Sequence, residues 1–270
     1  MGHFRFDEYD DARVAELART YAGAEPFPHL VLDDVLVAGP EVAADFPAPD
    51  WDGWYRFEDG YQRGKRQCND RLAVPEPFRS MLDELNGPAT LRFLERVTGI
   101  DALVPDPYLE GGGLHGSVGG GVLAPHTDFH LHQRLHLYRR LNLLVYLNPG
   151  WSEGDGGQLE LFADAHAEHA ARRVVPTFGR AVLFGTDDRS VHGFPTPVRE
   201  GAYRRSLALY YYTSEESPTY GGDVTTYWRR HERHTGVRRA RMATYRGLIF
   251  VARGVAHLAH RANPDWTRGG

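Results

Sequence analysis

Hydrophobic and polar positions follow a helical pattern over much of the first 100 residues. Apolar residues recur at three- and four-residue spacing in 11–22, which predicts a short amphipathic helix. Residues 76–100 predict two helices, interrupted where Asn86-Gly87-Pro88 breaks the pattern. Residues 27–36 predict a short strand and a turn, and the polar, glycine-containing stretch 51–66 is expected to form a loop.

The pattern changes at about residue 103, where short runs rich in β-forming residues alternate with Gly, Pro and Asp turns. No helical stretch of ten or more residues separates these runs, which argues against a parallel βαβ sheet. We therefore predict a mainly β fold with flanking helices and a jelly-roll core. The expected strands lie in 114–118, 122–129, 141–148, 157–162, 172–177, 180–186, 190–195 and 204–213.

Helical spacing returns near residue 238, with an apolar stripe that includes Leu248, Val251 and Val255. The expected organisation is one domain over 1–270. A helical layer (1–100) supports the jelly roll (101–215), and a helical C-terminal extension (216–270) covers part of it. A chain of 270 residues is long enough to bury a core of its own.

Composition narrows the possible partners. The net charge of −5 argues against a polyanionic partner such as nucleic acid. Residues 228–270 nevertheless hold ten arginines, which form either a basic arm or, as we prefer, helices docked on an acidic body. The single cysteine, the polar start and the lack of a long apolar run predict a cytoplasmic protein with no membrane contact.

A cluster of metal-capable side chains occupies 125–132, in the sequence PHTDFHLH. On a strand His126 and Asp128 point the same way and can reach one ion. His130 and His132 share their phase, but a strand advances roughly 3.3 Å per residue, so all four cannot bind the same ion. A third ligand must come from another strand, and the best candidate is His192 in SVHGFP.

Two histidines and one carboxylate form the facial triad of non-haem Fe(II) oxygenases, which leaves coordination positions open. Oxygen activation requires such open positions. Structural zinc prefers a closed set of four ligands, usually with thiolates, and the chain has one cysteine. The spacing therefore favours redox-active iron at His126, Asp128 and His192.

A possible carboxylate-binding pair follows twelve and fourteen residues after His192. Arg204 and Ser206 are two positions apart in RRSLALYYYT and share one strand face. A guanidinium and a hydroxyl together suit a carboxylate. A dicarboxylate that chelates iron at one end and pairs with Arg204 at the other would satisfy both features, and 2-oxoglutarate is such a molecule.

Together these motifs resemble the signature of the Fe(II)/2-oxoglutarate-dependent oxygenases over about residues 108–213. The stretches LNLLVYLNPGW and GGQLELF are similar to the prolyl-hydroxylase-like branch. The resemblance implies a double-stranded β-helix core. It also implies that Tyr146 contacts the distal carboxylate of 2-oxoglutarate, that Asn142 hydrogen-bonds this co-substrate, and that Leu161 packs on its methylenes.

The resemblance further implies a reaction with Fe(II), 2-oxoglutarate and O2. Oxidative decarboxylation to succinate and CO2 would be coupled to hydroxylation of an unactivated C–H bond in a small-molecule, carrier-bound or peptidyl substrate. A carboxylate at Asp128 favours hydroxylation over halogenation. Desaturation, epimerisation and ring formation are alternatives. A redox-inactive jelly roll, such as an isomerase or a sugar-binding module, is the alternative from another class.

The sequence gives less specific predictions for the remaining polar residues near these motifs. His130, His132 and His136 are expected to be structural or to support the ligands, and His115 either faces the pocket or lies in a solvated loop. Arg139 and Arg140 are expected to form surface ion pairs.

Overall fold

The computed structural model describes residues 2–164, 168–215 and 226–228, together with Thr244, Leu248, Val251 and Val255. These last four residues are helical and lie in the predicted C-terminal extension, whose other residues are outside the described ranges apart from 226–228. Within the described part, no helix is both long and apolar enough to cross a membrane.

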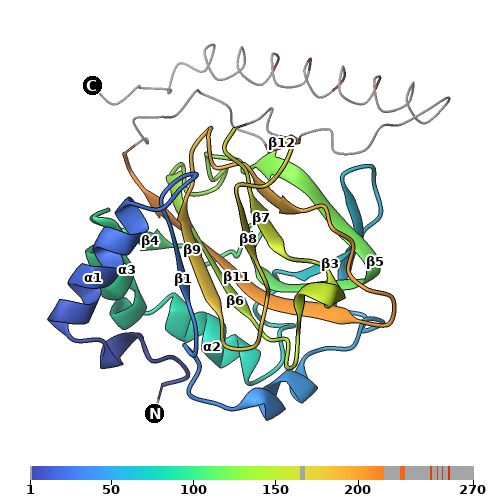
Figure 1. Cartoon of the computed structure of the whole chain (residues 1–270), viewed down its shortest axis with the longest axis horizontal. Coiled ribbons are helices and arrows are strands. Elements are labelled where there is room, and N and C mark those ends of the chain that lie inside the picture. The colour runs from blue at the N-terminus through green and yellow to red at the C-terminus, as the bar shows by residue number, and fades with distance from the viewer. Residues whose placement is uncertain are drawn as a thin grey trace.

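Antiparallel strands dominate the fold and curve into a nearly closed barrel (Figure 1), which confirms the predicted jelly roll. The main path of neighbouring strands is β1-β9-β6-β11-β5-β10-β7-β8, with β3 and β12 also paired to β5, β2 to β3 and β4 to β11. The strands are β1 (His29–Leu32), β2 (Tyr55–Phe57), β3 (Gln62–Cys68), β4 (Val104–Pro105), β5 (Gly113–Thr127), β6 (Tyr138–Tyr146), β7 (Leu159–Leu161), β8 (Arg172–Val174), β9 (Ala181–Gly185), β10 (His192–Phe194), β11 (Tyr203–Thr213) and β12 (Tyr227–Trp228).

The helices pack on the outside of this barrel, on the side of β1 and β11 (Figure 1). They are α1 (Asp11–Ala22), α2 (Phe78–Leu85) and α3 (Pro88–Thr98), with short 3-10 turns η1 (Phe6–Glu8), η2 (Pro40–Asp45) and η3 (Glu153–Asp155). The Asp10 side chain caps α1 by accepting from the backbone N–H of Arg13. Gly99 ends α3 in the left-handed conformation. The predicted helix at 11–22 and the break between the two helices of 76–100 are thus confirmed.

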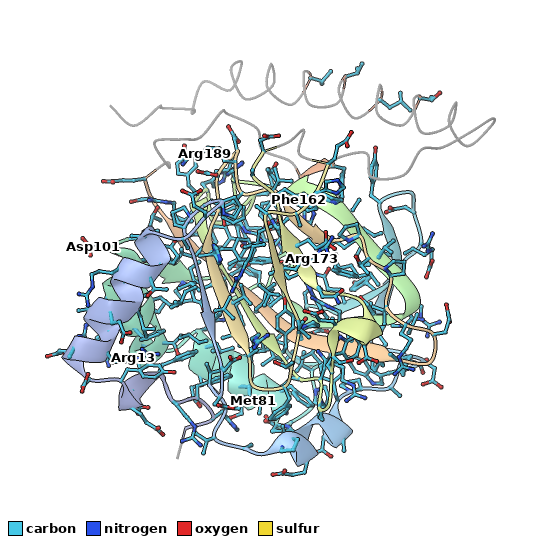
Figure 2. The ribbon with its side chains drawn as sticks, in the orientation of Figure 1. Arg13, Met81, Asp101, Phe162, Arg173 and Arg189 are labelled. Atoms are coloured by element: carbon cyan, nitrogen blue, oxygen red, sulfur yellow. The ribbon has the colours of Figure 1, made fainter. Side chains whose placement is uncertain are left out.

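Alternation along β6 and β11 divides the buried side chains between two sides of the sheet. Leu141, Leu143 and Val145 join the large core beneath the helices, and Tyr146 belongs to a smaller apolar cluster inside the barrel. Figure 2 shows side chains filling both regions, with Met81 of α2 inside the core and Arg13 of α1 pointing outward. The inward face thus remains available for polar groups.

One long strand, β5, connects the two halves of the barrel. The sequence predicted two strands here, but residues 113–127 form one strand that pairs with β11 in its first half, with β3 on both sides of a bulge, and with β10 near its end. Between Val118 and Val122 the glycines of 119–121 bulge out of register with β3. The bulge lets one strand contribute to both halves.

The expectation of a loop at 51–66 is wrong, because part of this stretch forms the hairpin β2–β3. Asp59 Oδ1 accepts from the backbone N–H groups of Tyr61 and Gln62 and so stabilises the turn. Gly64 lies at φ 64°, where an added Cβ would be 2.9 Å from the Cα of Gly121. This close approach allows β3 to add to the edge of β5.

Candidate active site

Three metal-capable side chains meet at one end of the barrel. His126 is the second-to-last residue of β5, and Asp128 follows two residues later. His192 begins β10 directly opposite His126. The Nε2 atoms of the two histidines each lie 3.5 Å from an oxygen of Asp128. Candidate ligand atoms of all three residues lie within 4.8 Å of one another. The predicted triad is thus assembled on adjacent strands.

The two histidines are oriented by the same type of hydrogen bond, from Nδ1 to the backbone carbonyl two residues earlier. His126 Nδ1 lies 2.9 Å from the carbonyl of Ala124, and His192 Nδ1 lies 2.9 Å from the carbonyl of Ser190. A carbonyl only accepts, so each Nδ1 carries the proton and donates it. Each Nε2 therefore keeps its lone pair directed at the triad, as a metal ligand requires.

Asp128 is held by two buried donors that the sequence did not identify as its partners. Arg139 Nη2 lies 3.0 Å and Asn142 Nδ2 2.7 Å from Asp128 Oδ2. Burial alone would raise the pKa of Asp128, but Arg139 and the two histidines hold it well below its usual range. The expectation of a surface ion pair for Arg139 is wrong, since this side chain is 1% exposed.

An aromatic ring covers one of the histidines. The Trp228 indole of β12 stacks on His126 with ring centroids 4.5 Å apart, and its ring also stacks on Tyr61 at 5.4 Å. Strand β12 pairs with the end of β5, with Trp228 opposite His126. Trp228 therefore shields the metal-binding end of the barrel from one side.

Arg204 lies deeper in the barrel, on the inward face of β11. Its Nε donates to the carbonyl of Gly157 at 2.8 Å and its Nη2 to the hydroxyl of Tyr146 at 3.3 Å. The guanidinium also lies over the rings of Tyr146 and Phe194. No carboxylate of the described residues lies within 4.0 Å of it, although Arg204 is 5% exposed. Burial lowers the pKa of this guanidinium.

Two of the other residues predicted to bind the co-substrate, Ser206 and Asn142, line the cavity, whereas Leu161 is buried beside it. Ser206 pairs with Tyr146 across β11 and β6 and lines the same cavity as Arg204. Leu161 pairs with His192 and is fully buried in the apolar cluster of the barrel. Asn142 lines the cavity, with its amide bonded to Asp128 and Arg139. The contacts of these residues with 2-oxoglutarate stay predictions.

A cavity of about 350 Å³ joins the triad to Arg204. Side chains from β2, β3, β5, β6, β10 and β11 line it, including Lys65 and His115. Burial, with Lys65 nearby, lowers the pKa of His115 well below its usual range, so this imidazole is neutral. His115 thus faces the pocket, which was one of the two positions expected for it. The sequence analysis did not predict that Lys65 would line the cavity.

The remaining histidines of the cluster point elsewhere. Strand β5 ends at Thr127, so His130 and His132 do not continue in its phase. His132 Nδ1 accepts two backbone N–H groups, and its Nε2 lies 3.1 Å from Asp106 Oδ1. His130 Nε2 lies 3.1 Å from Asp188 Oδ1. Both histidines contact groups outside the triad, in agreement with the structural role expected for them.

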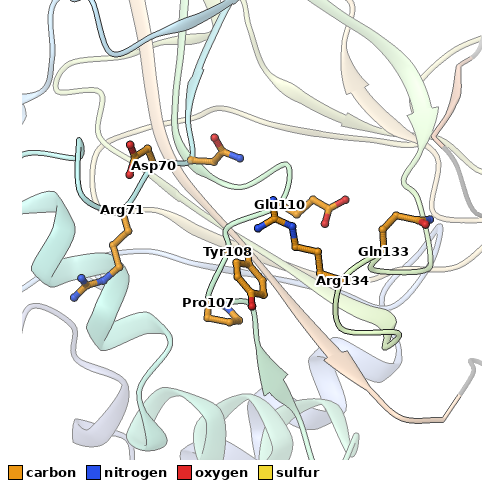
Figure 3. Close-up of a pocket in the computed structure, with 8 residues that line it drawn as sticks. Asp70, Arg71, Pro107, Tyr108, Glu110, Gln133 and Arg134 are labelled. Carbon is orange, nitrogen blue, oxygen red and sulfur yellow. The ribbon is translucent and has the colours of Figure 1, made fainter.

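A second, more open hollow of about 610 Å³ lies beside the end of β3 (Figure 3). The Arg134 guanidinium lies over the Tyr108 ring in its wall, 4.9 Å from the ring centroid. None of the triad residues lines this hollow. The candidate active site is therefore the cavity beside the triad.

Comparison with known proteins supports this assignment. The family model of the 2OG-Fe(II) oxygenase superfamily matches residues 113–212, the stretch that carries the triad and Arg204. The match covers 100 of the 270 residues. The predicted resemblance is confirmed, and the match, together with the cluster of His126, Asp128 and His192, supports an oxidoreductase that uses Fe(II) and 2-oxoglutarate.

Solved structures show the same fold. A prolyl hydroxylase from Trichoplax adhaerens, solved with a hypoxia inducible factor peptide, is 17% identical, with 76% of this chain and 94% of that chain covered and a TM-score of 0.50. A prolyl 4-hydroxylase from Phytophthora capsici is 22% identical, with coverages of 88% and 72% and a TM-score of 0.50. The epimerase SnoN from nogalamycin biosynthesis is 16% identical, with coverages of 85% and 98% and a TM-score of 0.51. A search of curated protein sequences finds no significant match.

Proposed function

We propose that this oxygenase hydroxylates an unactivated C–H bond of a small-molecule or carrier-bound substrate. The reaction is coupled to decarboxylation of 2-oxoglutarate to succinate and CO2. The observation that carries the proposal is the buried guanidinium of Arg204, which faces the cavity of the triad without a carboxylate partner among the described residues.

A buried charge without a partner is costly, so Arg204 requires an anion from outside the chain. The distal carboxylate of 2-oxoglutarate would provide it, with Tyr146 and Ser206 as hydroxyl donors from the neighbouring strand positions. A redox-inactive metal site, such as that of an isomerase or a sugar-binding module, has no use for this arginine. The arrangement therefore favours the oxygenase over that alternative.

The donor set fits Fe(II). His126 and His192 offer Nε2 atoms, because each Nδ1 is bonded to a backbone carbonyl, Asp128 offers an ionised carboxylate, and three protein ligands leave positions open. Bound Fe(II) supplies the centre at which O2 is reduced while 2-oxoglutarate is oxidised. Arg139 and Asn142 hold Asp128 in place, and Trp228 limits the access of water to His126.

The carboxylate of Asp128 favours hydroxylation over halogenation, because it occupies a coordination position that a halide would otherwise take. The cavity of about 350 Å³ is at the small end of ligand pockets, which suits a small molecule or one end of a larger one. Phe57, Phe194 and Trp228 give it apolar walls. A peptide side chain is the alternative substrate.

An anaerobic titration tests the proposal. Apoprotein is mixed with Fe(II) and then with 2-oxoglutarate, and the visible charge-transfer band of the chelated 2-oxo acid is recorded. The wild type should show the band, and His126→Ala should lose it. Arg204→Met should need roughly 100-fold more 2-oxoglutarate, since it removes a charge-assisted, bidentate partner.

The matched control is Arg205→Met, one residue along the same strand, because the Arg205 guanidinium lies on the opposite face and donates to the carbonyl of Ala43. This variant should bind 2-oxoglutarate like the wild type. A wild type that binds metal without a band, or an Arg204→Met variant with unchanged 2-oxoglutarate binding, would contradict the proposal. Succinate release then serves as the readout for substrate searches.

A further inference from the structure

Lys65 is the chain's sole lysine, and it faces the cavity. On β3 it lies opposite Ser117 of β5, and Arg204 of β11 lies opposite the same serine from the other side. Residues in register on antiparallel strands point to the same face of a sheet. Lys65, Ser117 and Arg204 therefore form one row across the inner wall of the barrel.

The ammonium of Lys65 has no acidic partner in the part of the chain that the structure describes. Its Nζ donates to Gln62 Oε1 at 3.0 Å and lies 5.0 Å from the centroid of the Phe57 ring. No described carboxylate lies within 4.0 Å of it. Burial lowers the pKa of Lys65 to about 8, and the charges of Asp128 and Asp59 oppose this shift. Near neutral pH the ammonium is still mostly protonated.

The charges of the cavity are unbalanced even with its cofactors present. Among the residues that the structure describes, its charged lining consists of three cations, Lys65, Arg139 and Arg204, and one carboxylate, Asp128. Asp128 neutralises Arg139, and the two charges of 2-oxoglutarate offset those of Fe(II). Two positive charges therefore remain in a confined, weakly polar space, where they attract an anion.

Lys65 and Arg204 have different surroundings within this cavity. Arg204 is surrounded by Gly157, Tyr146 and Phe194, from β6, β10 and the loop before β7. The partners of Lys65, Gln62 and Phe57, both come from the β2–β3 hairpin. The two cations lie on strands that are two strand spacings apart, roughly 10 Å, and their hydrogen-bond partners in the described residues are different.

We propose that Lys65 binds an anionic group of the primary substrate, a carboxylate or a phosphate, and so determines which C–H bond faces the iron. This inference rests on the proposed function and adds the substrate class to it. Lys65 acts here as a point charge that an arginine can replace, with Gln62 as its positioning partner and Phe57 as the apolar wall beside it.

The test uses the anaerobic complex with Fe(II) and 2-oxoglutarate, in which binding next to the iron alters the charge-transfer band. The probes are benzoate and phenyl phosphate, with benzamide as the neutral comparator. The variants are Lys65→Met, which keeps an apolar stem, and Lys65→Arg, which restores the charge. Arg56→Met is the matched control, because Arg56 lies on the same hairpin, is exposed and does not line the cavity.

On this proposal at least one anion changes the band of the wild type, of Lys65→Arg and of Arg56→Met, and benzamide does not. Lys65→Met weakens anion binding by about tenfold or more and leaves the 2-oxoglutarate concentration at half-saturation unchanged. A preference for benzoate or for phenyl phosphate identifies the anion as a carboxylate or a phosphate.

Four results on anion binding would overturn the inference, and one on 2-oxoglutarate binding would do the same. The four are no response to either anion, equal responses to benzoate and benzamide, unchanged anion binding in Lys65→Met, or displacement of 2-oxoglutarate by the anions. Weaker 2-oxoglutarate binding in Lys65→Met would assign the lysine to the co-substrate and also overturn it. A wild type without any band is a different failure, because it removes the proposed oxygenase itself.

Discussion

Arg139 Nη2 lies 3.0 Å from Asp128 Oδ2, and the two residues form a buried ion pair inside the barrel. The guanidinium of Arg139 is also stacked on Tyr210, 3.3 Å from its ring centroid, and its Nε donates to Asn142 Oδ1. These contacts fix the arginine before any metal is bound. The carboxylate of the triad is therefore held in its ionised form by the fold itself.

Replacing this arginine should destabilise the metal-free protein. Arg139→Met leaves Asp128 buried without its cation, which is expected to lower the free energy of unfolding by about 3–5 kcal/mol. Urea unfolding of the apoprotein at neutral pH measures this loss. Arg140→Met is the control, since Arg140 donates to the Thr213 hydroxyl instead. Equal stability of the two variants would show that the ion pair contributes little.

A methyl group at Gly157 should disturb the co-substrate end of the cavity. Gly157 has a φ of 63°, and an added Cβ would lie 3.0 Å from Arg204 Cδ. Gly150→Ala is the matched control, because Gly150 has a φ of 68° and nothing within 4 Å of its added Cβ. Both variants should lose about 1–2 kcal/mol of stability through the backbone. Only Gly157→Ala should also raise the 2-oxoglutarate concentration needed for half-saturation, and parallel behaviour of both would refute this.

Trp228 should report metal binding through its fluorescence. Because its ring stacks on His126 at 4.5 Å, an open-shell ion such as Co(II) in the triad should quench its emission. Zn(II), with a filled d shell, should quench far less. Trp228→Phe should lose most of the Co(II)-dependent quenching, whereas Trp151→Phe should keep it, since Trp151 bonds to Gly156 in the loop before β7. Unchanged quenching in Trp228→Phe would place the ion elsewhere.

Anion binding at Lys65 should depend on pH in a defined direction. The ammonium binds the anion, and its pKa is lowered by burial to about 8, with Asp128 and Asp59 opposing the shift and Arg139 and Arg204 adding to it. Benzoate binding should be strongest at or below neutral pH and should weaken as the pH rises through about 8. In Lys65→Arg it should stay constant over this range, because a guanidinium remains protonated. A decline shared by both proteins would point to another group.

Much of the barrel was predictable because its strands alternate and are separated by turns. The same alternation placed His126 with Asp128 and Arg204 with Ser206 on single faces. The third ligand, His192, could be chosen because few metal-capable residues follow Asp128 on a strand-forming stretch. The register that places His192 opposite His126 depends on long-range pairing, which a single sequence does not display.

Arg139 was misplaced because the predicted strand began at residue 141, whereas β6 begins at Tyr138 and contains a bulge. Tyr211 pairs with Leu141, but Tyr212 pairs with Arg139, so Arg140 is an extra residue. Strict alternation from Asn142 would place Arg140 inside and Arg139 outside, whereas the bulge turns Arg139 toward Asp128. A one-residue irregularity of this kind leaves no local signal in a run of two arginines.

The hairpin β2–β3 was missed for a different reason. Its strands are rich in charged residues and contain Gly64 within β3, so they lack the apolar alternation of a typical strand. The turn signal of Asp59-Gly60 was present but was not flanked by hydrophobic runs. Pairing with β5 supplies the stabilisation that local propensity does not, and it brings Lys65 into the cavity.

The position of Lys65 also makes the cavity chemically addressable. Among these 270 residues there is one lysine, so reagents that acylate or reductively alkylate side-chain amines would modify Lys65. A pKa of about 8 supplies free amine at mildly basic pH, where most lysines remain protonated. Routine biotinylation or surface coupling through amines would therefore occlude the cavity, and attachment through another residue type would leave it open.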